Sequence, residues 1–146
     1  MPTGLYRKGI YHDFHNNFNV GRRPDRYLNI SPTSGLVVAG GWSADSDDTL
    51  YWLTPVIGTT STVLLHRLAK YLRVGNDTIV LPVADLAASL GVPPSKLRAA
   101  ITRLVLYGYL TKVGDRLEVP MTVTLKSGMI RKLPVFLQEA WNLEHP

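Results

Sequence analysis

The chain has 146 residues, of which 45% are hydrophobic and 18% charged, so it fits one globular domain and is not a globally disordered protein. It contains no cysteine, which excludes disulfides, thiolate metal sites and cysteine nucleophiles. The whole net charge of +5 lies in residues 56–112, because the segments before and after them are neutral. A local excess of positive charge predicts an electropositive face for a polyanion, although +5 also fits an ordinary solvated surface.

Neither a membrane span nor a secretory signal is predicted. No apolar run approaches the roughly 20 residues that cross a bilayer. The N-terminal sequence MPTGLYRKGIYHDF lacks a hydrophobic stretch followed by a small-residue cleavage site. We therefore expect a cytoplasmic protein that has no membrane partner.

Residues 1–54 form a segment rich in Gly, Asn, Asp, Pro and Ser that also holds eight aromatic side chains. Disordered tails are poor in aromatics, so we expect this arm to pack on its own domain or on a second copy. Within it, GLVVAGGW (35–42) predicts a short strand and SADSDD (43–48) an acidic loop. GLVVAGG lacks the Gly-Lys-Ser/Thr ending of a phosphate-binding loop.

The pattern becomes helical from Pro55. The segment TTSTVLLHRLAKYLRVGND opens with hydroxyl residues that suit a helix N-terminus and closes on the stop signal Gly75-Asn76. Its apolar residues recur at three- and four-residue steps and form one stripe: Leu64, Leu65, Leu68, Tyr71 and Leu72. The run TIVL (78–81) then predicts a short strand.

Two shorter helices follow, joined by the turn GVPP. The first, PVADLAASL, starts at Pro82 and ends at Gly91. The second is predicted to be capped by Ser95 and to end near Gly108. Its predicted buried face consists of Leu97, Ala100, Ile101, Leu104 and Val105.

The remaining chain predicts a hairpin and a helical end. YLTKVGDRLEV reads as two strands around Gly114-Asp115, and PMTVTL either extends the second strand or packs beside it. SGMIRKLPVFLQEAWNLEH predicts one or two helices, with Pro134 in the first turn of the last one. One face of this end is expected to carry Leu133, Leu137, Ala140, Trp141 and Glu144.

The order of these elements predicts the fold class. Helix, strand, helix, helix and hairpin in sequence is the order of a winged helix-turn-helix, an α+β and mainly α fold with a three-helix core and a β-hairpin wing. We expect this domain at residues 55–120, preceded by the arm of residues 1–54 and followed by a C-terminal strand and helical extension at 121–146.

The helix pair has the features of a DNA-reading helix-turn-helix. Gly91 tolerates the left-handed backbone that stops the first helix, and Val92 suits the apolar plug between the helices. The second helix leaves one face free for DNA, which carries Ser95, Lys96, Arg98, Ala99, Thr102 and Arg103.

Each residue type on that face suits a contact with DNA. The cations Lys96 and Arg98 suit guanine edges or phosphates, and the small Ala99 permits close approach to the floor of a groove. Thr102 and Arg103 lie nearer the phosphate backbone, and Ser95 suits a phosphate held by the helix N-terminus. On the hairpin, Arg116 is the candidate for a phosphate contact, although Asp115 beside it opposes one.

The stretch LAASLGV, followed by SKLRAAITRLVLYGYL, resembles winged-helix regulators, in which LA..LGV precedes a recognition helix and RL...G.L leads into the wing. The resemblance covers residues 60–120. YWLTPVIGTTSTVLLHRLA and LKSGMIRKLPVFLQEAW are also similar to small uncharacterised actinobacterial and actinophage winged-helix proteins. The two prolines of VPPSK and the short hairpin KVGDRLEV depart from the family pattern.

Other candidate sites are weaker. His12, Asp13 and His15 in YHDFH could begin a metal site, but no further ligand cluster is evident, so we expect no metal and no cofactor. DSDD lacks the glycine and the closing glutamate of a calcium loop, and no nucleophile or paired-carboxylate arrangement is detectable, so an enzyme is not expected. The arginines of NVGRRPDRY (19–27) suit a minor-groove arm, but a neutralised surface segment is the favoured interpretation.

The sequence therefore predicts a sequence-specific double-stranded DNA-binding protein, a transcriptional regulator that acts as a homodimer. Residues 95–107 would be the recognition helix in the major groove. Dimerisation is inferred from the aromatic arm and from Phe136 and Trp141 in the last helix. The alternative is a protein-interaction adaptor with the same fold, for example a phage factor that docks on host machinery. A metal-dependent enzyme using His12 and His15 is a remote third hypothesis.

Overall fold

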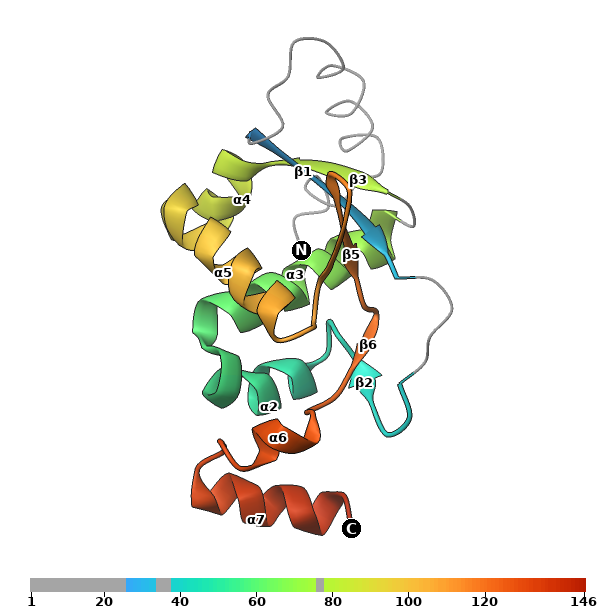
Figure 1. Cartoon of the computed structure of the whole chain (residues 1–146), viewed down its shortest axis with the longest axis vertical. Coiled ribbons are helices and arrows are strands. Elements are labelled where there is room, and N and C mark those ends of the chain that lie inside the picture. The colour runs from blue at the N-terminus through green and yellow to red at the C-terminus, as the bar shows by residue number, and fades with distance from the viewer. Residues whose placement is uncertain (1–25, 34–37, 76–77) are drawn as a thin grey trace.

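The computed structural model describes residues 26–33, 38–75 and 78–146, which form an α+β fold of six helices and two small sheets (Figure 1). The helices are α2 (Asp47–Ile57), α3 (Thr59–Gly75), α4 (Val83–Ser89), α5 (Pro94–Leu106), α6 (Ser127–Ile130) and α7 (Val135–Glu144). The strands are β1 (Tyr27–Pro32), β2 (Trp42–Ser43), β3 (Ile79–Pro82), β4 (Thr111–Val113), β5 (Arg116–Val119) and β6 (Thr122–Val123).

The larger sheet has the order β3-β1-β5-β4, so its centre is built by the N-terminal strand. β1 runs antiparallel to β3, with Ile30 opposite Ile79, and parallel to β5, with Ile30 opposite Leu117. Ile30 is fully buried, and α3 packs against this sheet (Figure 1). The described part of the predicted arm thus belongs to the same hydrophobic core as the segments that follow it, and residue 54, where the arm was expected to end, lies inside α2.

Helix α2 was not predicted. Asp47 and Asp48, assigned to an acidic loop from the sequence, form its first turn, where negative side chains favour the positive end of the helix dipole. Of the strand expected at residues 35–42, the described part is a turn followed by Trp42, which pairs with Val123 in the second sheet. Asp45, in the turn after β2, accepts hydrogen bonds of 2.7 and 2.8 Å from Arg73 at the end of α3, and this guanidinium lowers the pKa of the carboxyl.

The helix pair agrees with its prediction except at the N-terminus of each helix. Pro82, predicted in the first turn of the first helix, is the last residue of β3 and directly precedes α4. Gly91 closes α4 with a φ of 71°, and Val92 packs against the core in the turn. However, α5 begins at Pro94 after Pro93, so Ser95 lies inside the helix and does not cap it. Within the predicted buried face, Ile101 and Val105 are only half-buried and the other three residues are buried.

The predicted hairpin is present as β4 and β5, with the turn at Gly114-Asp115. The segment PMTVTL does not extend β5 as a strand but turns away, and its β6 pairs with β2. Two helices follow, where the sequence predicted one or two, and Pro134 directly precedes α7. Of the residues expected on one face of this end, Leu133, Leu137 and Trp141 are buried, whereas Glu144 is exposed.

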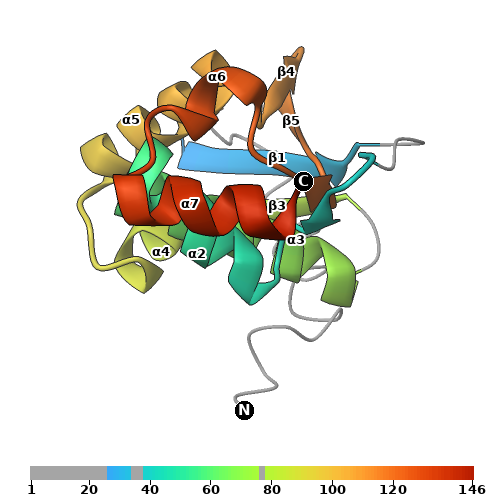
Figure 2. The ribbon, with the colours of Figure 1, turned by 90° about the horizontal axis from the view of Figure 1, so that it is seen from below.

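The three tryptophans of the chain lie together around Trp141 of α7. Figure 2 shows α7 lying across α2. The ring of Trp141 lies edge-on to those of Trp42 and Trp52, with centroids 6.0 and 4.9 Å away, and His145 stacks on it at 3.7 Å. Since Trp141 is only 6% exposed, it holds α7 on its own chain and is not available to a second copy.

Tyr109 ties the end of α5 to the chain that leads into α6. Its buried hydroxyl donates a hydrogen bond of 2.8 Å to the carbonyl oxygen of Thr124, and burial raises its pKa to about 12. Because the pKa is raised in the folded state, this group's contribution to stability is complete below the unfolded value of about 10 and is lost as the pH rises toward 12.

Tyr109→Phe is therefore expected to lower the free energy of unfolding by about 1 kcal/mol at pH values near 8, where the hydrogen bond is intact. Between pH 10 and 12 the native protein should lose stability faster than the variant, so the difference between them should shrink. Urea unfolding across this pH range measures both stabilities. Parallel pH profiles of the two proteins would contradict this assignment.

Candidate nucleic-acid interface

Helix α5 presents the predicted face to solvent. Its packing side is formed by Leu97, Ala100 and Leu104, which are 0–5% exposed. The opposite side and its flanks carry the six side chains predicted to face DNA, all of them exposed: Ser95, Lys96, Arg98, Ala99, Thr102 and Arg103. Leu106, which was not among them, lies on the same outward side and is 80% exposed.

One flank of α5 borders a groove at the junction of α2 and α3. This groove has a volume of about 400 Å³ and is lined by Ile57, Gly58, Thr59, Thr60, Ser61, Lys96, Ala99, Ala100 and Arg103. Arg103 crosses it and donates a hydrogen bond of 3.2 Å to the carbonyl oxygen of Ile57, the last residue of α2. Part of the donor capacity of Arg103 is thus used to hold two helices together.

The same groove contains the start of α3. The first amides of a helix have no acceptor within it and form its positive end, so the turn from Thr59 to Ser61 favours an anion. Gly58 precedes this turn with a φ of 89°, and a Cβ atom there would lie 3.0 Å from the Arg103 guanidinium. Lys96 lines the groove from the opposite side. Helix amides, hydroxyl groups and two cations therefore surround one small space, a combination that suits a phosphate group.

Sequence reasoning did not identify Thr59 and Thr60 as part of this site. The string GTTS at a helix start was a visible signal, but only the tertiary fold brings it beside α5. The start of α5, which was expected to hold a phosphate together with Ser95, is less suitable. Pro94 has no N–H group, and the amides of Lys96 and Leu97 donate to the carbonyl oxygen of Pro93.

The other flank of α5 borders a larger groove of about 640 Å³, closed by β1 and the β4–β5 hairpin. Its apolar lining is formed by Leu28, Ile101, Val105, Leu106 and Leu117, and its polar lining by Tyr27, Thr102, Lys112, Asp115 and Arg116. The mixture of five apolar side chains with both signs of charge resembles a site for a protein or an amphipathic molecule more than a track for phosphates.

Besides Arg103, two further residues predicted to contact phosphates already make contacts within the chain. Arg116 lies beside Glu118, with Nη2 and Oε2 3.6 Å apart, and its Nε is buried without an acceptor among the described residues. The hydroxyl of Thr102 donates to the carbonyl oxygen of Arg98 at 3.1 Å, so a phosphate contact requires this proton to turn outward. The tip of the hairpin is occupied by Gly114 and Asp115 and is not basic.

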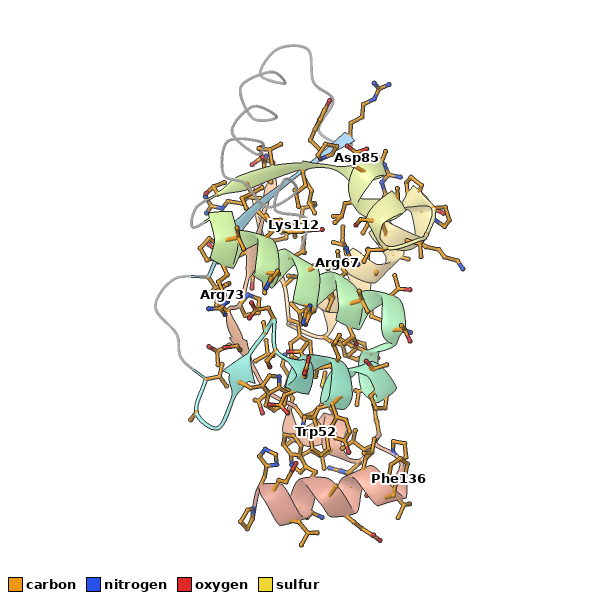
Figure 3. All side chains as sticks on the ribbon, turned by 180° about the vertical axis from the view of Figure 1, so that it is seen from behind. Trp52, Arg67, Arg73, Asp85, Lys112 and Phe136 are labelled. Carbon is orange, nitrogen blue, oxygen red and sulfur yellow. The ribbon has the colours of Figure 1, made fainter. Side chains whose placement is uncertain are left out.

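The basic residues of segment 56–112 lie on two helices and one strand. Arg67, Lys70 and Arg73 lie on α3, while three others lie on α5 and Lys112 lies on β4 (Figure 3). Arg73 is paired with Asp45. The positive charge that the sequence suggested for one face is thus shared by two helices and the hairpin.

His12, Asp13 and His15 of the weak metal hypothesis, and Arg22 and Arg23 of the possible minor-groove arm, lie outside the described residues. Among the residues that are described, no group of three potential ligands is placed to hold a metal ion. In the same part of the chain, every helix is too short or too polar to cross a bilayer.

A scan against protein-family models found no match to this chain, and no curated protein or solved structure is significantly similar to it. Function therefore has to be inferred from the site itself.

Proposed function

We propose that the chain is a cytoplasmic, sequence-specific double-stranded DNA-binding protein of winged-helix type, acting as a transcriptional regulator. Helix α5 would lie in the major groove and the β4–β5 hairpin would be the wing. The observation that carries this proposal is the outward face of α5, where Lys96 and Arg98 flank the small Ala99 and all three are exposed. An exposed helix of this composition, preceded by a short helix and a glycine turn, suits direct reading of base edges.

The groove between α5 and the start of α3 adds a place for the DNA backbone. A phosphate there would meet the first amides of α3 together with Lys96 and Arg103. Such a contact would fix the angle at which α5 enters the major groove. Arg116 would contribute less than its position in the sequence suggests, because Glu118 lies beside it.

The test is binding of genomic DNA fragments, measured by mobility shift at low salt and then by fluorescence anisotropy across a salt series. Arg98→Ala and Lys96→Ala should each weaken binding and reduce the slope of log affinity against log salt by about one. Lys70→Ala, which removes one positive charge from α3, is the matched control and should leave the slope unchanged.

Arg103→Ala is a less direct probe, because it also removes the hydrogen bond to Ile57 and so alters the packing of α2. A failure of every genomic fragment to bind at low salt would exclude the proposed function. Binding of all fragments with equal affinity would exclude its sequence-specific part.

A second candidate, the protein-interaction adaptor, is favoured by the larger groove and by Leu106, which is 80% exposed at its edge. An exposed apolar side chain beside an apolar groove suits a partner protein better than a phosphate backbone. Leu106→Ser should then abolish capture of a partner while Arg98→Ala leaves it intact. For a DNA-binding protein, these two variants should have the opposite ranking in the DNA assay.

A further inference from the structure

Helix α7 has two apolar faces, of which only one is used within the chain. Leu137 and Trp141 pack inward, where Trp52 of α2 points toward them (Figure 3). On the rest of α7, Val135, Phe136 and Leu143 are 70, 69 and 84% exposed. Single exposed apolar residues are ordinary, but three large ones on a ten-residue helix form a patch that soluble proteins usually cover.

The spacing of this patch fits a helix partner. Phe136, Ala140 and Leu143 stand at positions i, i+4 and i+7, which places them along one side of α7. A second α7 running in the opposite direction would set each Phe136 against the partner's Leu143. The small Ala140 between them is half-buried against the chain's own core, and its size would let the two helices approach closely. Such a surface is self-complementary, as a two-fold symmetric dimer requires.

The charges of α7 favour the antiparallel arrangement. Arg131 and Lys132 precede the helix, while Glu144 is its last residue and Glu139 lies near its middle. The two basic residues lie next to the positive N-terminal end of the helix dipole, and Glu144 lies at its negative C-terminal end. Both placements are unfavourable within one chain. An antiparallel copy would place the acidic end of one helix beside the basic end of the other. A parallel copy would instead bring like charges together.

We propose that the stripe formed by Phe136, Ala140 and Leu143 is a homodimer interface in which two α7 helices pack antiparallel. The inference goes beyond the proposed function and does not depend on it. The sequence suggested Phe136 and Trp141 of the last helix as dimer contacts. Trp141 is instead an internal contact, so Phe136 and Leu143 are the residues that would meet the partner. In Figure 1, α7 lies at one end of the molecule and α5 lies away from it, so the dimer leaves both α5 helices exposed.

Sedimentation of the full chain without DNA over a wide range of concentrations tests this interface. The native protein should move from monomer to dimer as concentration rises, and Leu143→Glu should weaken the association at least tenfold. Asn142→Glu, which adds the same charge at the adjacent exposed position away from the stripe, is the control and should dimerise normally. Leu143→Ser repeats the test without a new charge, and tryptophan fluorescence verifies that α7 stays docked in each variant.

A charge exchange tests the direction of packing. Arg131→Glu should weaken the dimer, and adding Glu144→Arg to it should restore the association, because opposite charges then meet again across the antiparallel pair. A native protein that remains monomeric at the highest concentration would overturn the proposal. So would a folded Leu143→Glu variant that dimerises like the native chain. If the dimer forms but the charge exchange fails to restore it, the antiparallel arrangement is wrong.

Discussion

Trp52→Ala is expected to lower the free energy of unfolding by about 3–5 kcal/mol, the range for removing a large aromatic side chain from a core. Trp52 is 2% exposed, and its ring meets that of Trp141 edge-on at a centroid distance of 4.9 Å. The substitution leaves a cavity and also removes the surface on which α7 rests. Because domains of this size are stabilised by only about 5–15 kcal/mol, the variant should be close to unfolding at room temperature.

Urea unfolding followed by far-ultraviolet circular dichroism measures this loss. Trp52→Phe should recover part of it, since a smaller ring still fills much of the site. Glu139→Ala, an exposed change on α7, is the control and should stay within about 0.5 kcal/mol of the native protein. A loss of less than about 1 kcal/mol for Trp52→Ala would show that the tryptophan cluster does not hold α7 in place.

The parts of the fold that the sequence predicted are those with local signals. The stripe from Leu64 to Leu72 indicates α3 because a helix repeats every 3.6 residues, and no distant residue is needed to recognise it. Gly91 and Gly114 mark turns for the same local reason, since both adopt a positive φ. The helix pair and the hairpin were therefore predicted, except for the residues at which the two helices begin.

The elements that were missed depend on distant partners. β1 has few apolar residues, and it is a central strand only because residues 79–82 and 116–119 pair with its two edges. α2 was obscured by Pro55 inside it, which usually marks the end of a helix, and by the run of Ser and Asp residues at its start, which was interpreted as a loop although acidic residues also begin helices. Its stability comes from packing Trp52 and Leu53, which local propensity does not report.

In the candidate site, too, the features with local signals were predicted and those that depend on distant contacts were not. Helical periodicity predicted six of the residues of α5 that face solvent but not Leu106. It did not reveal that Arg103 reaches Ile57, or that Thr59 and Thr60 border the same groove, because these contacts join separate helices. The position of Arg116 beside Glu118 was open to prediction, since residues two apart on a strand share a face.

Ile30→Ala is the change expected to show most directly that the N-terminal strand belongs to the core, with a loss of about 2–5 kcal/mol in the free energy of unfolding. Ile30 is 0% exposed at the centre of the sheet, between Ile79 of β3 and Leu117 of β5. The cavity left there would loosen the contacts of both neighbouring strands. Leu28 on the same strand lines the larger groove beside α5, so the change should also disturb that flank of the site.

Urea unfolding again measures the loss, and Val38→Ala, which removes two methyl groups at a position 36% exposed, is the control. Amide hydrogen exchange adds a local measurement, because the backbone of β1 is paired on both edges and should be among the most protected in the native protein. If Ile30→Ala costs no more than Val38→Ala and the amides of β1 exchange rapidly, β1 is not an integral part of the core. A large loss together with slow exchange would show that the strand before α2 is needed for the sheet that supports α5.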